Sequence, residues 1–445
     1  MNQQLKFTLI LLVISSASFA AVDPSATIGN LTIEGAIKKG LSYSPDIQKA
    51  EDNLKAATAT LNKAKGAFFP TINAVGAATN KTNSTTSPNS TVPSTVSSAN
   101  GDTYQAGLTL SQPLYSGGAL TGGLGLYKSQ EDLARQALFL SKQTLLQSLL
   151  SAYYALVQSE MTLEAAQSNR DINKAFVDIT NHYARIGRSR KMDELQSQAN
   201  YSLSLVDTEQ NQVLLYTNQA NINRYLGDPR TTPVKSSYRV TINPIGNLTL
   251  DQALETAGKN NPTILTDVLN VSIVDYNKQV DLSLDMPSLS LAATGGYQAP
   301  DVPDMWISSS QYYSVGLNLT VPLFSGLSSI SKRSIYENQK YAAEKQLQSD
   351  KDNLRVLIET AMNNIKSTQI QLDLAVRSVK EARQALDLAN KGYKEGTAAV
   401  TDVTANQTTR YNAEKIFITA QFAYLSALLT LRQQMGIDLE KAYAH

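Results

Sequence analysis

Few side chains in this 445-residue sequence are suited to covalent or metal chemistry. There is no cysteine, which excludes disulfides, thiolate metal sites and a cysteine nucleophile. The sequence has two histidines, His182 and His445, so we expect no histidine-based catalytic pair or metal cluster. The 39 basic and 38 acidic residues nearly balance, which argues against nucleic acid as a partner. We therefore predict no enzyme activity, no catalytic residue, no metal and no cofactor.

The charged residues that stand out gather at two equivalent places. The first place combines four cations with two acids, namely Arg185, Arg188, Arg190, Lys191, Asp193 and Glu194. The second place carries Asp402 after Tyr393. A glycine precedes each acid, Gly187 or Gly396, and glycine suits the left-handed end of a helix, while a carboxylate favours the start of the next one. The pattern predicts two helix-to-helix tips. Simple capping also explains each residue singly.

The tips belong to one unit that occurs twice. Residues 112–117 (QPLYSG) recur 209 positions later as residues 321–326 (VPLFSG), and the same offset relates Asp193 to Asp402. Upstream the offset is 217, and the difference of eight residues falls around the Ser/Thr/Asn-rich stretch at residues 80–100. A length difference confined to a polar stretch predicts an exposed loop.

Two segments have the alternation of a strand with one apolar face. Residues 104–114 and 313–323 alternate between apolar and polar side chains, and weaker strands precede them at residues 71–79 and 288–297. Each run is about as long as a tilted strand that crosses a bilayer. Four strands cannot close a barrel, because about eight are needed. Since open edges are not tolerated in lipid, several subunits must share one barrel if the strands span.

A tight strand-to-helix turn follows each hairpin. Its markers are Pro113 and Gly117 in the first copy, and Pro322 and Gly326 in the second. The first turn is rich in glycine but lacks the Gly-Lys-Ser/Thr ending of a phosphate loop. A tight bend of the backbone is therefore the better interpretation.

Long heptad patterns follow the turns. From residue 354 to residue 393, apolar or small residues recur at alternating spacings of four and three, with Thr368 as the one polar member, which predicts a coiled-coil seam. The first copy shows the same frame from Leu145 to Ala166 and then decays at Arg170 and Asn173. Helices over about residues 120–186 and 327–394 would each be ~100 Å long at 1.5 Å per residue.

The predicted fold class is mainly α with membrane β. A duplicated unit gives each subunit four membrane strands in a shared trimeric barrel, and long coiled-coil helices. Residues 1–20 have the positive start, apolar stretch and small-x-small site of a secretory signal. The predicted units are 1–20 signal peptide, 21–227 first repeat (hairpin 71–115, tip near 187–193), 228–247 linker, 248–436 second repeat (hairpin 288–324, tip near 396–402) and 437–445 C-terminal tail.

Together these features resemble the TolC-like outer-membrane efflux protein family of Gram-negative bacteria, the outer-membrane factors of tripartite efflux or type I secretion systems. The likeness rests on the paired Pro-Leu-aromatic-Ser-Gly turns, on helix starts at Ser44-Pro45 and Asn261-Pro262, and on Tyr393-x-x-Gly396 followed by residues 400–403 (VTDV). It covers nearly the whole chain after the signal.

The resemblance implies a homotrimer. Three copies of four strands give a twelve-stranded barrel in outer-membrane lipid, and the helices form a tunnel in the periplasm. The duct would dock a periplasmic adaptor (membrane fusion) protein and an inner-membrane ABC or proton-driven pump, and would pass substrates without chemistry of its own.

The resemblance also gives the tips a role, as a gated periplasmic entrance held by tyrosine, arginine and aspartate. Asp193, Tyr393 and Asp402 match that pattern, but Ala398 stands where an arginine is expected and Ala405 replaces a second acid.

We hypothesise that the four cations of the first tip, Arg188 and Arg190 with Arg185 and Lys191, replace the missing arginine. They would pair with Asp193 or Asp402 across the aperture. The rival interpretation is that these cations bind the adaptor or solvate the tip. The turns at Gly187 and Gly396 are expected to contact the adaptor.

Two other functional classes share some of these features. A trimeric coiled-coil surface adhesin, or another structural outer-membrane protein, also combines a signal, heptads and membrane strands, but an adhesin carries its strands once, at the C-terminus. A periplasmic enzyme would need a nucleophile or acid–base pair at a meaningful spacing. The cargo of a duct is open among drugs, metals and a secreted protein. The lack of a lipid-anchor cysteine favours the branch that also serves secretion.

Overall fold

The computed structural model describes residues 31–81, 101–237 and 248–443. The predicted signal peptide, most of the Ser/Thr/Asn-rich stretch and half of the predicted linker lie outside the described residues. The elements in chain order are α1 (Ile33–Tyr43), α2 (Pro45–Gly66), β1 (Thr71–Lys81), β2 (Gly101–Ser116), α3 (Ala119–Arg185), α4 (Lys191–Leu226), α5 (Leu250–Asn260), α6 (Pro262–Leu282), η1 (Ser283–Asp285), β3 (Ser288–Ala299), η2 (Pro303–Trp306), η3 (Ser308–Ser310), β4 (Gln311–Thr320), α7 (Ser328–Glu395), α8 (Val400–Gln434) and α9 (Leu439–Tyr443). Both long helices, α3 and α7, begin and end within one residue of the predicted bounds.

Each repeat begins with two helices whose starts are set by local capping. Thr32 and Thr249 are the N-caps of α1 and α5, and their hydroxyl oxygens accept from backbone N–H groups three residues later (3.0 and 3.3 Å). Pro45 and Pro262 open α2 and α6, at a position where the missing N–H has no helical partner to lose. The predicted helix starts at the two Xaa-Pro pairs are confirmed.

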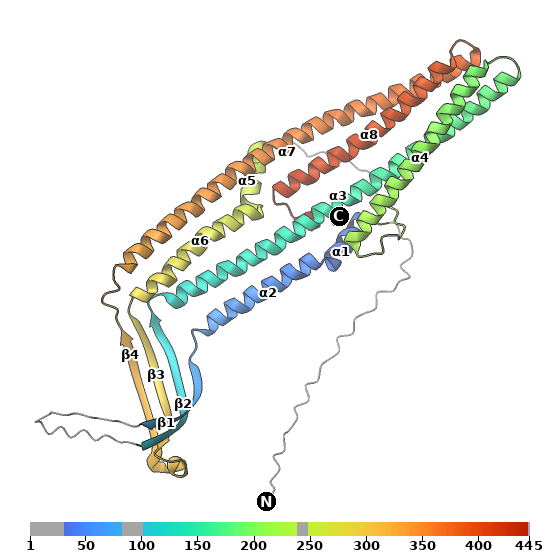
Figure 1. The fold of residues 1–445 in the computed structure, drawn as a ribbon. Coiled ribbons are helices and arrows are strands. Elements are labelled where there is room, and N and C mark those ends of the chain that lie inside the picture. Colours follow the sequence, from blue (N-terminus) through green and yellow to red (C-terminus); the bar gives the residue numbers. More distant parts are fainter. Residues whose placement is uncertain (1–30, 82–100, 238–247, 444–445) are drawn as a thin grey trace, which may run out of the picture.

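The four strands form one antiparallel sheet in the order β1-β2-β3-β4, at the opposite end of the molecule from the helix tips (Figure 1). Residues that pair directly across strands share a face. One row in register is apolar: Ile72, Leu110, Ala293 and Val315. The next row is polar: Asn73, Thr109, Thr294 and Ser314. The predicted alternation is therefore confirmed, and the β2–β3 pairing joins the two repeats into one sheet.

The second hairpin ends earlier than predicted. We expected the alternation of β4 to continue through Val321 and Leu323, but the strand stops at Thr320. Its partner β3 begins at Ser288, which already pairs with Thr320, so the following residues have no strand beside them. In the first copy, β2 runs on to Ser116, because a bulge at Pro113/Tyr115 lets it follow β3 to its first residue.

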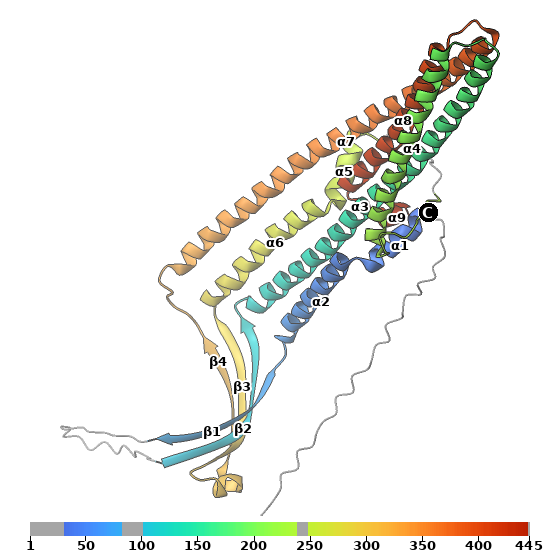
Figure 2. The same cartoon turned by 45° about the vertical axis from the view of Figure 1, so that its right-hand side comes forward.

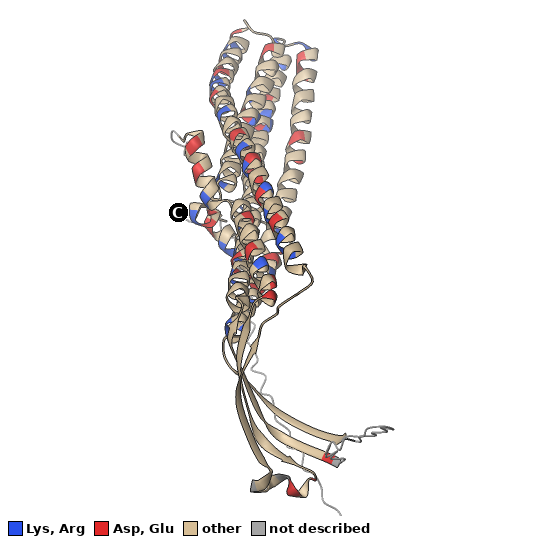
Figure 3. Ribbon diagram, turned by 90° about the vertical axis from the view of Figure 1, so that its left-hand side faces the viewer, with Lys and Arg blue, Asp and Glu red and all other residues tan. Residues whose placement is uncertain are grey.

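Charged residues are distributed over the helices and are nearly absent from the strands (Figure 3). Between residues 71 and 80 of β1, between 103 and 116 of β2, and along β3 and β4, no Lys, Arg, Asp or Glu occurs. The polar face of the sheet therefore consists of uncharged hydroxyl, amide and glycine residues.

The helices extend from the sheet in one elongated body (Figures 1 and 2). Near the sheet, α2, α3, α6 and α7 lie side by side, with α3 in contact with both α2 and α6. Further out, α3 pairs with α4, α7 pairs with α8, and α8 packs against α3. No helix in the described part of the chain combines the length and the apolar character needed to span a membrane.

The seam of α7 against α8 follows the predicted frame. Its central members are buried and almost all apolar: Leu354, Ile358, Ala361, Ile365, Thr368, Leu372, Ala375, Ala382 and Leu386. The seam of α3 does not fail after Ala166, contrary to our expectation. Asn173 and Thr180 are buried at predicted positions, whereas Asn169 and Phe176 are buried one residue before the positions that the frame predicts. A shift of this kind is a local break in heptad phase.

The segment predicted as a C-terminal tail is folded. It forms α9, which packs against α1 and α3, and its Leu439 is fully buried in the core of the first repeat. Beside the same core, Leu31 forms a parallel bridge with Ser236, and the Ser236 backbone N–H donates to Glu160 (2.9 Å). The middle of the molecule thus ties together segments that are far apart in sequence.

Candidate functional site at the helix tips

The first tip joins α3 to α4 through a short loop at residues 186–190. Gly187 has φ 73°, a left-handed value that favours glycine. The N–H of Gly187 donates to Ala184 O (3.1 Å), and the N–H of Arg188 donates to Tyr183 O (2.8 Å). These bonds satisfy the last carbonyls of α3, and they fix the direction in which the basic residues leave the helix.

Asp193 is the third residue of α4 and closes the first tip. Its carboxylate accepts from the N–H of Arg190 (3.2 Å), from the Arg190 guanidinium (3.3 and 3.4 Å) and from the Ser189 hydroxyl (3.4 Å). Burial alone would raise the pKa of Asp193, but the hydrogen bonds from Arg190 and Ser189 outweigh it and lower that pKa. Arg190 thus forms its ion pair within its own tip.

The second tip joins α7 to α8 and has the same backbone design. Gly396 has φ 81°, and the N–H groups of Thr397 and Ala398 both donate to Gly392 O (2.8 and 3.1 Å). Asp402 is the third residue of α8, and its carboxylate accepts from the N–H of Ala399 (2.8 Å). No cation pairs with Asp402 in the described part of the chain.

Three aromatic rings connect the two tips. Tyr393 on α7 lies 5.3 Å from Phe176 and 5.7 Å from Tyr183, both on α3, measured between ring centroids. Burial raises the pKa of Tyr393, and the nearby Ser189 side chain partly opposes that shift. The guanidinium carbon of Arg188 lies 5.2 Å from the centre of the Tyr183 ring. Rings and cation therefore form one contact between α3 and α7.

The structure brings some of the predicted gate residues together and leaves others apart. Tyr393 and Arg188 meet through Tyr183, and Arg190 meets Asp193. The predicted ion pairing across the aperture, from one tip to the other, does not occur within the described part of one chain. Phe176 and Tyr183 were missed by the sequence analysis. Two features of the sequence could have indicated them. Phe176 is an aromatic residue next to a predicted seam position, and Tyr183 is an aromatic residue four positions before Gly187.

The strand-to-helix turns differ in their surroundings. At Gly117 (φ 61°), a Cβ atom would lie 2.7 Å from Ser283 O and 2.6 Å from the Cβ of Met286, so only glycine fits. At Gly326 (φ 64°), nothing lies within 4 Å of such an atom. The neighbouring Leu323 and Phe324 are 93% and 83% exposed. Pro113 and Gly117 are packed against the chain, whereas Pro322 and Gly326 lie in an open turn.

Comparison with known proteins decides the family. Residues 36–228 and 253–437 match the profile of the outer membrane efflux protein family. The chain belongs to this family. Those two matched segments lie on either side of residues 229–252, so both repeats are covered.

Individual relatives support the same assignment. The chain is 24% identical to the protein CyaE of Bordetella pertussis over 70% of this chain, an alignment that spans 64% of CyaE. It is 22% identical to the outer membrane protein TolC of Vibrio cholerae over 75% of this chain and 77% of TolC.

Solved structures have the same fold. The outer membrane protein VceC of Vibrio cholerae superposes with a TM-score of 0.75 at 17% identity, covering 91% of this chain and 96% of VceC. The CmeC outer membrane channel of Campylobacter jejuni gives a TM-score of 0.74 at 17% identity, covering 91% and 86%.

Membership of the outer membrane efflux protein family confirms several predictions. The fold class and the outer-membrane location with periplasmic helices are those of the family. The family consists of channels and not of enzymes, so the prediction that this chain is not an enzyme is confirmed, and the adhesin alternative is set aside. No group of His, Cys, Asp or Glu in the described ranges is arranged to hold a metal ion.

Proposed function

We propose that three copies of this chain form a passive exit duct for efflux or type I secretion. The sheets of the three copies would close one twelve-stranded barrel, and the helices would continue it as a periplasmic tunnel. The tunnel would dock a periplasmic adaptor (membrane fusion) protein at the turns around Gly187 and Gly396, and through it an inner-membrane ABC or proton-driven pump.

The observation that carries the proposal is a sheet with two free edges and an uncovered apolar face. β1 and β4 each pair on one side only. The apolar face of β4 is open, with Tyr313, Leu317 and Leu319 exposed at 90%, 64% and 66%. Free backbone edges are costly in lipid and invite pairing in water. A ring in which β4 of one copy pairs with β1 of the next removes both edges and turns the apolar face to lipid.

The duplication supplies a register for that ring. β2 and β4 occupy equivalent positions in the two repeats, as do β1 and β3, so the pairing of β2 with β3 is a template for β4 with the next copy's β1. Leu108 pairs with Gly295 within the chain. The residue 209 positions after Leu108 is Leu317, and the residue 217 positions before Gly295 is Ala78. Leu317 should therefore lie opposite Ala78 of the next copy.

Cysteine cross-linking tests this register, because the natural chain has no cysteine. The variant with Leu317→Cys and Ala78→Cys should form disulfide-linked dimers and trimers under mild oxidation in membranes. The control combines Leu317→Cys with Ala77→Cys, which places the two thiols on opposite faces because side chains alternate along a strand. Equal cross-linking of both variants, or none, would reject the proposed ring.

The proposed gate consists of Tyr393, Asp402, Asp193, Arg188 and Arg190. Within the described chain, Asp402 and Arg188 make no ion pair, whereas Asp193 and Arg190 neutralise each other. We therefore expect the charges of Asp402 and Arg188 to act on ions at the aperture. The two residues could also pair with each other, either between the tips of one copy or between copies.

Planar-bilayer recordings test the gate. Asp402→Ala should shift the reversal potential away from cation selectivity and change conductance. Asp193→Ala removes a carboxylate that is already paired with Arg190, so it should change selectivity less and mainly loosen the start of α4. Unchanged conductance and selectivity in both variants would reject the gate.

A further inference from the structure

A polar link joins the two helix pairs of one copy, between α4 and α8. The Tyr411 hydroxyl of α8 donates to the Asp207 carboxylate of α4, and Lys415 Nζ lies 3.8 Å from the same carboxylate. Tyr411 is only 7% exposed, and burial, with Asp207 next, raises the pKa of Tyr411, so its hydroxyl keeps the proton that it donates. Asp207 therefore marks the face of the first pair that meets the second pair.

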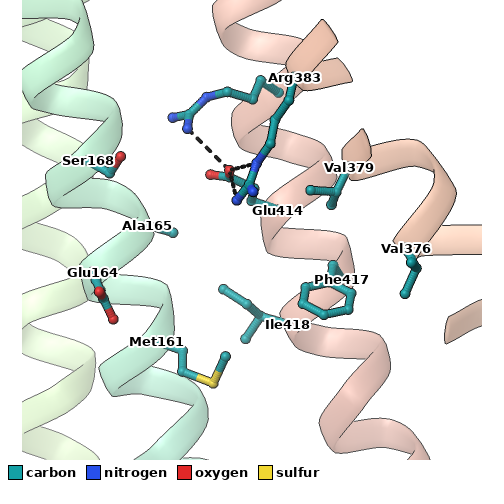
Figure 4. A pocket seen from close by; sticks show the side chains of 11 residues that line it. Met161, Glu164, Ala165, Ser168, Val376, Val379, Arg383, Glu414, Phe417 and Ile418 are labelled. Atoms are coloured by element: carbon teal, nitrogen blue, oxygen red, sulfur yellow. Dashed lines mark hydrogen bonds and ion pairs between the residues drawn. The ribbon is translucent and has the colours of Figure 1, made fainter. Parts of the chain in front are cut away.

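The larger contact between the pairs lies between α3 and α8. Met161 and Ala165 of α3 point toward Ile418 of α8 (Figure 4). Ser168 of α3 and Glu414 of α8 line the same cavity. This contact shows how a first helix pair meets a second one.

The duplication predicts how the second pair of one copy meets the first pair of the next. A residue of α3 or α4 corresponds to the residue 209 positions later in α7 or α8. In α7, Ile370 and Leu374 therefore take the places of the two α3 residues that point toward α8, and they are 60% and 54% exposed. In α8, Ile416 takes the place of Asp207 and is 59% exposed. The second pair thus presents an apolar face where the first pair has a carboxylate.

The matching face of α4 is also apolar and uncovered. Leu205 takes the place of Glu414 and is 40% exposed. Val206 takes the place of Lys415 and is 55% exposed. The carboxylate and the cation of the polar link therefore both have branched apolar side chains as their equivalents.

A groove between α7 and α8 lies on this face of the second pair. Its volume is about 460 Å³, and none of its residues lines the cavity that faces α3. Most of its side chains are small, which lets another helix approach closely. Its lining includes Leu374, Ala375, Ser378, Ile416, Ala420 and Ala423.

We propose that α4 of a second copy occupies this groove. Val206 of that copy lies against Ile416, and Leu205 of that copy lies against Leu374. This contact rests on the proposed function, because it needs the ring of three copies. The helix pairs are then joined by polar groups within a copy and by apolar side chains between copies.

A pair of opposite charges flanks the proposed contact. Ser168 and Ile418 line the cavity within a copy, and their equivalents are Arg377 of α7 and Glu209 of α4. Both equivalents are exposed, and neither forms an ion pair within the described residues. Opposite charges on two facing surfaces favour their association and fix its register.

Cysteine pairs test the contact in the full chain, in isolated outer membranes. The variant with Val206→Cys and Ile416→Cys should form disulfide-linked dimers and trimers under mild oxidation. The control combines Ile416→Cys with Leu195→Cys, because Leu195 is also exposed and apolar but lies about 16 Å from Val206 along α4. A disulfide needs Cα atoms within about 7 Å, so the control should give roughly tenfold less product.

Exchanging the chemistry of the two junctions is a second test. Val206→Lys alone or Ile416→Asp alone places a charge against an apolar side chain, so each should lower the temperature at which trimers dissociate on native gels. The double variant recreates between copies the ion pair of Lys415 with Asp207, and it should recover most of the lost stability.

The sheet variant with Leu317→Cys and Ala78→Cys reports on the ring independently. If the sheets cross-link but the two helix variants cross-link equally or not at all, the apolar contact is overturned and the ring stands. If the charged double variant is no more stable than either single variant, the contact is overturned as well. Failure of the sheet and helix pairs together overturns both proposals. Cross-linked helices without cross-linked sheets would support the contact and reject the register of the strands.

Discussion

The pairs α3–α4 and α7–α8 are closely similar in length and in connection but are held together differently. Against α8, α7 presents Leu354, Ile358, Ile365, Leu372 and Leu386, with small alanines between them. In the outer half of the other pair, the buried residues are mostly polar: Asn169, Asn173 and Thr180 of α3, and Ser197, Ser204, Thr208 and Asn211 of α4. The Thr180 and Ser197 hydroxyls bond to each other at 2.7 Å.

The second helices of the two pairs, α4 and α8, also differ in how much of their apolar surface is buried. α8 is buried on several sides, by α7 and by α3. α4 leaves Leu203, Val206 and Val213 exposed at 68%, 55% and 63%. The comparison teaches that the α7–α8 seam relies on apolar burial, which is strong and non-directional. The outer half of the α3–α4 seam relies on small polar contacts, each worth only about 1 kcal/mol net.

The largest expected effect comes from removing apolar seam volume. Ile358 is fully buried, so Ile358→Ala should destabilise α7–α8 by roughly 2–5 kcal/mol. Ser204 is 4% exposed in the other seam, and Ser204→Ala should cost about 1 kcal/mol or less. Thermal midpoints from circular dichroism of the full chain in detergent measure both. Equal shifts would show that the two seams do not differ as described.

Between about pH 4 and pH 7, a pH effect on stability should come from the second repeat. Asp267 of α6 is buried beside Asp350 of α7, and burial, with Asp350 next, raises the pKa of Asp267 to about 6. A folded pKa raised above the unfolded value of 3.8 means that the fold holds the proton more tightly. The protonated Asp267 carboxyl therefore contributes its full stabilisation below about pH 4 and loses it as pH rises through about 6. This stabilisation is roughly 1–3 kcal/mol.

The first repeat supplies the control for that effect. Its equivalent positions are Ala50 and Ser141. The double substitution Asp267→Ala and Asp350→Ser should therefore flatten the dependence of the thermal midpoint on pH between 4 and 7. A slope that persists in the double variant would place the titrating group elsewhere.

The smallest expected effect concerns the link between the two pairs. Tyr393→Ala removes the ring that contacts Phe176 and Tyr183, a loss of about 1–2 kcal/mol. The tips should then separate more often, seen as longer or larger openings in planar bilayers. Tyr393→Phe keeps the ring and should behave like the natural chain. An Ala variant with unaltered openings would mean that the rings do not hold the tips closed.

Sequence patterns predicted the parts of the fold that are periodic and local. The α7 seam, the strand alternation and the two Xaa-Pro helix starts each depend on neighbours in the chain, so they were readable. The shift of the α3 seam at Asn169 was not, because buried asparagine looks like a surface residue. The pairing of β2 with β3 was equally hidden, since nothing local selects a partner strand.

The tip region was predicted in outline only. Glycine and aspartate marked both turns, but the choice of Asp193 as the partner of Arg190 depends on side-chain geometry. The ion pair between Arg383 of α7 and Glu414 of α8 (2.8 Å) was missed altogether, because no spacing along one helix relates these two residues.

The placement of α9 has a consequence for the order in which the molecule is assembled. Leu439 and the α8 residues Phe422, Leu425 and Leu429 share one core with Ala36 and Ile37 of α1. A chain leaves the ribosome from its amino end, so α1 must wait for some 400 further residues, and α3 for almost 300, before that core is complete. Contacts of such long range are slow to form. The first repeat therefore cannot mature as an independent unit, and it should remain dependent on holding chaperones until synthesis has passed α9.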